Sequence, residues 1–193
     1  MKKIIVLISL LLGVLVGLLI FSKSDEKTQS ITNATYDTPT PEPKLSETKS
    51  IDGKIKLVMQ SNLQDDGLVL YAFTVLDEKG ERTIFTKTAK PDAFALPQNS
   101  WSPSSTFVFI VENDPLTPQV LVFNSSGENF SETEKYINVT TLFQNKQQNY
   151  EFVEATGWDS RGLLHIKTKK TDGAKGPNFW FDVDSRSFIQ LAR

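Results

Sequence analysis

The sequence contains no cysteine and only one histidine, His165, among its 193 residues. Without cysteine, no disulfide framework can hold an exported domain together and no lipid can be attached to an N-terminal cysteine. One imidazole and no thiolate leave too few ligands for a zinc or other transition-metal site. We therefore predict no cofactor and no metal site, and stability must come from an ordinary hydrophobic core or from ions.

The sequence also lacks a strong excess of positive or negative charge, and it lacks the usual catalytic motifs. Residues 51–193 hold 15 Lys and Arg against 18 Asp and Glu, a net charge of 15 − 18 = −3, which gives no electrostatic case for a nucleic-acid partner. A Ser-His-Asp triad would need His165, but no Gly-x-Ser-x-Gly turn is present to expose a serine. The carboxylates lack the spacing of a calcium loop, so we place them in surface turns. We predict no catalytic residue.

One long apolar run is present, at the N-terminus. Met1-Lys2-Lys3 precedes eighteen residues without a charge, Ile4 to Phe21, which is the lower limit for a helix that crosses a bilayer. We interpret residues 1–21 as a transmembrane signal anchor; the alternative is a cleaved secretory signal, for which the run is long. The lysines favour an N-terminus inside and a C-terminal domain outside, and the absence of cysteine suits a bacterial envelope. The sequence therefore predicts a single-pass protein of the cell membrane.

Residues 22–50 have the composition of a linker. They are rich in Thr, Ser, Pro, Glu and Lys, include Thr38-Pro39-Thr40-Pro41-Glu42-Pro43 and carry almost no large apolar side chains. Such a segment cannot bury enough surface to offset the entropy of ordering, and its prolines favour extended conformations. We expect it to hold the exported domain away from the bilayer.

From residue 51 onward the composition changes to short strands separated by turn residues, which predicts one all-β domain over residues 51–193. A brief helical turn is expected near Val139 to Gln144. The strand candidates are Lys54 to Gln60, Leu68 to Leu76, Thr83 to Thr86, Thr106 to Glu112, Val120 to Phe123, Tyr150 to Glu154, Leu163 to Thr168, Asn178 to Val183 and Phe188 to Leu191.

Two phrases recur along this domain. The first is a turn before an apolar strand, and it occurs as Lys49-Ser50-Ile51-Asp52-Gly53, Trp101-Ser102-Pro103-Ser104-Ser105 and Trp158-Asp159-Ser160-Arg161-Gly162. The second is a hairpin turn that begins with Asp or Asn, at Asp77, Asn124 and Asp184. The intervals of 47 to 60 residues match one four-stranded propeller blade with loop insertions.

Trp101-Ser102-Pro103 together with Asp52-Gly53 resembles the Trp-Ser-Pro-Asp-Gly repeat of TolB-like and dipeptidyl-peptidase-IV-type β-propellers. The resemblance covers about residues 50 to 193. No unit has the whole motif: the first lacks Trp and Pro, the second Asp-Gly and the third Pro. It implies a structural role in blade turns for Asp52, Gly53, Trp101, Pro103 and Trp158, and it implies no chemistry.

The repeats predict three blade-like sheets, whereas closed propellers usually need at least four. Three arrangements stay open: an open three-sheet fragment, a ring completed by association of two chains, or an irregular sandwich. In the open fragment, exposed sheet edges would invite strand pairing with a partner.

Two groups of side chains are candidates for ligand contacts. The tryptophans are expected in the core, and Phe179-Trp180-Phe181 places aromatic rings on both faces of its strand, which predicts a sheet covered on both sides. The densest positive charge comprises Lys167, Lys169, Lys170 and Lys175, and it predicts a solvated hairpin tip or, functionally, a contact for anionic envelope material.

The sequence thus favours a membrane-anchored binding or protein-interaction module with no catalytic activity of its own. Its partners would be an envelope protein or a second copy, with the bilayer contacted through the N-terminal helix. The alternative is an envelope hydrolase or an accessory subunit of a peptidase.

Overall fold

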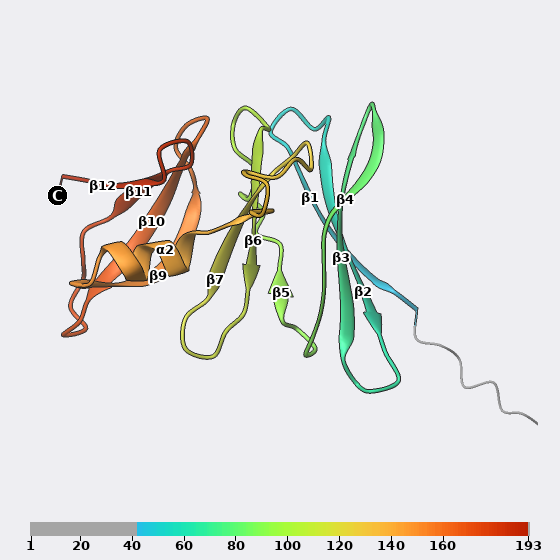
Figure 1. Ribbon diagram of the computed structural model, residues 1–193, viewed down its shortest axis with the longest axis horizontal. Helices are drawn as coiled ribbons and strands as arrows, with labels where there is room; N and C mark the ends of the chain where they lie inside the picture. The colour runs from blue at the N-terminus through green and yellow to red at the C-terminus, as the bar shows by residue number, and fades with distance from the viewer. Residues whose placement is uncertain (1–41, 193) are drawn as a thin grey trace, which may run out of the picture. The chain divides into compact units, whose positions relative to one another are not determined.

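The computed structural model describes residues 42–192, which form three four-stranded antiparallel sheets and one short helix (Figure 1). The membrane anchor predicted for residues 1–21 and most of the predicted linker lie outside the described residues. Among residues 42–192, no helix is long and apolar enough to span a bilayer. In each sheet the four strands are neighbours in chain order, so every sheet is a meander. The prediction of three blade-like units is confirmed.

The first sheet begins earlier than expected. Its first strand falls inside residues 22–50, the range predicted to be linker, so that range ends before Lys44. This edge strand contains a single leucine, and its polar residues give little hydrophobic signal. The strands are β1 (Lys44–Lys49), β2 (Lys56–Leu63), β3 (Val69–Asp77) and β4 (Gly80–Ala89).

The second and third sheets contain the remaining predicted strands and two short ones that the sequence did not reveal, β5 and β8. The predicted helical turn is confirmed as α2 (Val139–Lys146), whose N-cap Asn138 accepts a hydrogen bond from the Thr141 N–H at 3.0 Å. The second sheet comprises β5 (Phe94–Ala95), β6 (Phe107–Glu112), β7 (Gln119–Asn124) and β8 (Ile137–Asn138). The third comprises β9 (Tyr150–Trp158), β10 (Leu163–Lys170), β11 (Phe179–Asp182) and β12 (Ser187–Gln190).

The first repeated phrase joins the first and second strands of every sheet. In the first sheet, the Ser50 N–H donates to the Ile55 carbonyl at 2.8 Å, and the Ile55 N–H donates to Ser50 Oγ at 3.0 Å. In the second sheet, Ser102 and Phe107 make the same two bonds, at 2.9 and 3.0 Å. The buried serine therefore has the same structural role in both turns.

The third copy of this phrase departs from the other two. Asp159 occupies the serine position, and its N–H donates to the Leu163 carbonyl at 3.0 Å, across a turn one residue shorter. The second phrase also shifts in this sheet. Asp182, rather than the predicted Asp184, begins the hairpin and accepts the Asp184 N–H at 3.0 Å, while Arg186 takes the left-handed conformation with φ 53°.

Replacing Ser105 by glycine is expected to raise the free energy of unfolding by about 0.5 kcal/mol. A residue with a Cβ atom costs roughly 1 kcal/mol in the left-handed backbone conformation, and this exceeds the entropy cost of glycine. Ser105 has φ 57°, and Gly53 occupies the same turn position with φ 71°. The converse change, Gly53→Ser, should cost about 1 kcal/mol through the backbone alone, since an added Cβ meets no atom within 4 Å. Urea unfolding midpoints check both; a stabilising Gly53→Ser would contradict the equivalence.

The second sheet is the centre of the hydrophobic core, because both of its faces are covered. Val108, Ile110, Leu121 and Phe123 pack in one cluster with side chains of the first sheet. The alternate residues of the same strands pack in a second cluster with the third sheet and α2; these are Phe107, Phe109, Val120 and Val122. The alternation of a strand thus supplies both interfaces.

A tryptophan strengthens each of these interfaces. Trp101, only 3% exposed, donates from Nε1 to the Thr48 carbonyl of the preceding sheet at 3.4 Å. Trp158 donates in the same way to the Ser100 carbonyl at 2.8 Å and stacks on Phe107 with ring centroids 6.1 Å apart. Both rings thus lie at the start of a turn and bond to the backbone of a preceding segment. The corresponding residue of the first sheet is Lys49, which has no described sheet before it.

The outward faces of the first and third sheets are polar at positions that are apolar in the second. Counted from the matched turns, Lys56 corresponds to the fully buried Val108, and His165 corresponds to the fully buried Phe109. Cross-strand ion pairs lie on both outward faces, including Lys56 with Glu47 at 3.5 Å and Lys167 with Glu154 at 2.7 Å. Polar outer faces are typical of the terminal units of a stacked repeat.

Two long edge strands, β4 of the first sheet and β9 of the third, pair irregularly with their neighbours. In the pairing of β3 with β4, the register shifts after Phe73, so that Ile84 has no partner. The edge strand β9 pairs with β10 through two register shifts, one on each side of residues Ile166 and Lys167. Such bulges bend and twist an edge strand.

Candidate functional site: a groove beside the first strands

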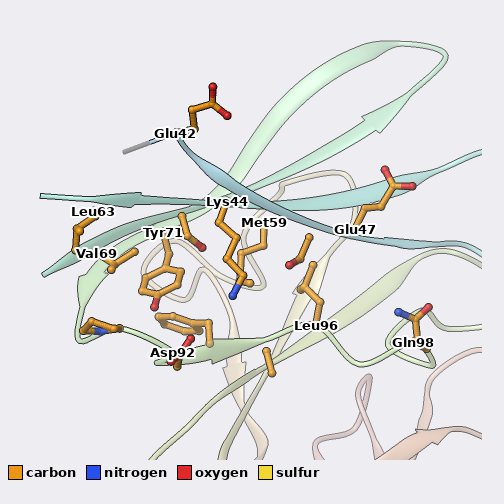
Figure 2. A pocket seen from close by; sticks show the side chains of 15 residues that line it. Glu42, Lys44, Glu47, Met59, Leu63, Val69, Tyr71, Asp92, Leu96 and Gln98 are labelled. Atoms are coloured by element: carbon orange, nitrogen blue, oxygen red, sulfur yellow. The ribbon is translucent and has the colours of Figure 1, made fainter. Parts of the chain in front are cut away.

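A groove of about 470 Å³ lies between the first sheet and the chain that enters the second (Figure 2). It lies beside the first strands, where the two sheets diverge. Its lining from the first sheet is Glu42, Lys44, Ser46, Glu47, Met59, Ser61, Leu63, Val69 and Tyr71; from the second it is Pro91, Asp92, Phe94, Ala95, Leu96 and Gln98.

The floor of the groove is apolar because these positions belong to the inner face of the first sheet. Met59, Val69, Tyr71 and Phe94 are each at most 7% exposed. The Tyr71 and Phe94 rings meet edge to face, with centroids 5.0 Å apart. This floor offers contact for an apolar group while the core beneath it stays closed.

The wall formed by residues 90–93 is fixed by hydrogen bonds. Tyr71 Oη donates to the Lys90 carbonyl at 3.0 Å and accepts the Ala93 N–H at 3.2 Å. The Asn113 N–H donates to the Ala93 carbonyl at 2.7 Å. A wall held from two sheets keeps its position when a ligand enters, which reduces the entropy lost on binding.

Of the described residues, Lys44 is the one basic residue that lines the groove, beside the acidic residues Glu42, Glu47 and Asp92. Figure 2 shows its side chain pointing from β1 toward the floor, whereas the carboxylates of Glu42 and Glu47 point away. Glu47 pairs instead with Lys49 and Lys56 on the opposite face, at 3.6 and 3.5 Å. Lys44 has no ion pair with any residue of the described range 42–192. Its ammonium group can therefore meet an anionic group of a ligand.

A corresponding groove of about 410 Å³ lies between the second and third sheets. Its lining includes Asn99 and Val120 from the second sheet and, at the irregular pairing of β9 with β10, Thr156 and Lys167 from the third, so these two residues border this groove as well as the outward face. Lys167, however, is bound to Glu154 at 2.7 Å. The cation is thus already neutralised in the second groove, and the first groove is the stronger candidate.

The four lysines proposed from the sequence as an anionic contact do not act as one group. Lys167 and Lys169 lie on β10 and pair with Glu154 and Glu151, both at 2.7 Å. Lys170 ends the strand, and Lys175 lies in the loop that follows it. The positive charge at this hairpin is therefore about half compensated.

The single histidine lies on the outward face of the third sheet. His165 Nδ1 is 2.5 Å from the hydroxyl of Thr156 on the neighbouring strand, and no carboxylate of residues 42–192 bonds to its other nitrogen. Within the same range, no three His, Asp or Glu side chains cluster as metal ligands would. Two turn carboxyls have lowered pKa values, and neither lines the groove.

These carboxyls are Asp52 and Asp77. The hydroxyl of Ser50, 2.6 Å from Asp52, and the Lys54 N–H hold the Asp52 pKa below its usual range. For Asp77, desolvation raises the pKa, but the Lys79 N–H and Arg82 outweigh it and the pKa is lowered. Both effects stabilise turns at the same end of the first sheet.

Neither a scan against protein-family models nor a search of curated proteins gave a match to this chain. The site must therefore be interpreted from its own residues.

Sequence patterns do not reveal the groove, because Lys44 falls inside the range predicted to be linker. A weak signal was present: after Pro43, the six residues Lys44–Lys49 contain no Gly or Pro. Proline commonly stands at the start of an edge strand. The rest of the lining belongs to predicted core strands, and only the crossing of residues 90–98 brings the two sets together.

Proposed function

We propose that this protein is a binding or protein-interaction module, without catalytic activity of its own, anchored in a bacterial cell membrane by an N-terminal helix and exposed outside the cell. The three sheets would be blades of the TolB-like propeller type. The observation that carries the proposal is the groove, whose 470 Å³ lies in the range of ligand sites and which contains the Lys44 ammonium group.

The groove fits an extended segment of an envelope protein better than a small compact ligand. It is open along the first strands, has an apolar floor at Tyr71 and Met59, and offers one cation at Lys44. A segment with an apolar side chain next to a carboxylate would match these features. Burial of the apolar group supplies affinity, and the ion pair supplies orientation.

Site-specific photocrosslinking in membranes tests this function. A photoreactive residue at Ser46 faces the groove, and one at the adjacent Leu45, 65% exposed, faces the opposite side of the same strand. We expect a discrete crosslinked product from position 46 and none from position 45. Mass spectrometry of the product identifies the partner.

Lys44→Glu provides the charge control. Reversing the charge should reduce the product from position 46 by roughly tenfold, since losing one desolvated ion pair and adding repulsion costs more than 1.4 kcal/mol. Lys54→Glu, at the far turn of the same sheet, should leave the product unchanged. Equal products from positions 45 and 46, or indifference to Lys44→Glu, would reject the groove as the binding site.

A further inference from the structure

Trp180 breaks the rule that the outward face of the third sheet is polar. Counted back from the hairpin that ends the third strand of each sheet, Trp180 corresponds to Val75 and Val122. Both valines are fully buried against the next sheet. The prediction that Trp180 also lies under a neighbouring sheet is wrong: no described sheet covers this face, and its side chain is half-buried.

The outward positions of β10 follow the polar rule. His165 stands where Leu57 and Phe109 are buried in the other sheets, and Lys167 stands where Met59 and Val111 lie. Position 180, by contrast, carries an aromatic ring where the other two sheets have valine.

The Trp180 ring is held in place by its neighbours. Its Nε1 donates a hydrogen bond to the carboxylate of Asp159 in the shortened turn. In the strand register it lies between His165 on β10 and Ile189 on β12, and Ile189 is 44% exposed. The indole therefore stands in a cross-strand row, with the polar His165 on one side and the apolar Ile189 on the other. An aromatic ring fixed in this way loses little entropy when it contacts a ligand.

We propose that this face binds a neutral saccharide, with a sugar ring stacked on Trp180. The C–H groups of a pyranose supply apolar contact for the indole face, and its hydroxyls can bond to His165, Thr156 and Asp159. The lysines of this face are already paired, Lys167 with Glu154 and Lys169 with Glu151 at 2.7 Å, and the Asp159 carboxylate accepts the hydrogen bond from the indole. A face whose charges are compensated favours an uncharged ligand.

The same pairs disfavour a protein as the occupant. A protein interface of ordinary size would cover Lys167, Glu154, Lys169 and Glu151, and removing paired charges from water has a cost that often exceeds their attraction. A saccharide leaves these groups hydrated or replaces their water with hydroxyls. This site lies apart from the groove and does not depend on it.

Calorimetric titration of the full chain with chitohexaose, a neutral β-1,4-linked oligosaccharide, tests the proposal, with maltohexaose as a second probe. The detergent must be zwitterionic and free of sugar headgroups, which would compete. We expect saturable binding of at least one probe by the wild type. Trp180→Val, which installs the residue of the equivalent positions, should weaken binding roughly tenfold, which corresponds to about 1.4 kcal/mol.

Two further variants separate stacking from folding. Trp180→Phe keeps an aromatic ring and should retain part of the affinity, while Lys56→Ala, on the outward face of the first sheet, should change nothing. Absence of binding to both probes by the wild type overturns the proposal, as does equal affinity of Trp180→Val. Loss of a protein contact in Trp180→Val, without saccharide binding, would assign the face to a protein partner instead.

Discussion

Replacing Val108 by lysine is expected to unfold the domain. Val108 is fully buried in the second sheet and points toward the first, in the cluster with Phe123. An unpaired ammonium group in this place costs several kcal/mol, a large part of the roughly 5–15 kcal/mol that stabilises a typical domain. Circular dichroism and urea unfolding of the purified chain measure the loss.

The matched control is Lys56→Val, which makes the opposite exchange at the corresponding position of the first sheet. Lys56 lies on an outward face, where its pair with Glu47 at 3.5 Å is exposed. Such pairs are worth at most about 1 kcal/mol, so stability should change by less than that. If Val108→Lys were tolerated as well as Lys56→Val, the second sheet would not be covered on both faces.

Replacing Trp101 by alanine is expected to lower the free energy of unfolding by about 3–5 kcal/mol, the usual cost of deleting a buried indole. The ring fills the interface between the first and second sheets, and its Nε1 bonds to the Thr48 carbonyl. Trp101→Phe keeps most of the packing and removes the hydrogen bond, so we expect a loss of about 1–2 kcal/mol. Urea unfolding at constant m-value measures both.

Leu116→Ala serves as the control for this series, because Leu116 is 94% exposed in the loop between β6 and β7. Its stability change should stay within about 0.5 kcal/mol. A loss of less than 1 kcal/mol in Trp101→Ala would show that the turn tryptophan does not join the sheets.

The sequence predicts most of this fold because strand alternation and turn chemistry are local. All nine predicted strands are present, and the two repeated phrases occur in equivalent turns of each sheet. The short strands β5 and β8 could not be predicted, since two-residue strands carry no periodicity. In the third sheet, the turn of Asp159 and the hairpin of Asp182 depart from the repeat in length, and only their hydrogen bonds reveal it.

The candidate sites combine residues from different segments, so the pattern of any single strand does not reveal them. The groove combines β1 with residues 90–98, which are about fifty positions apart and meet only through packing. Trp180 was expected in the core because Phe179 and Phe181 alternate with it, a pattern typical of a sheet covered on both sides. Whether another sheet covers this face depends on how the sheets are stacked, and the alternation of residues within one strand does not predict it.

The register shifts along β4 and β9 bear on how any partner can recognise this protein. An incoming strand needs an uninterrupted row of backbone donors and acceptors, and Ile84 and the two shifts in β9 interrupt that row. Pairing through backbone groups, which accepts almost any sequence, is thereby disfavoured at both long edges. Recognition at these two edges must then depend on side chains, so a partner there is selected by its sequence or its chemistry rather than by its readiness to extend a sheet.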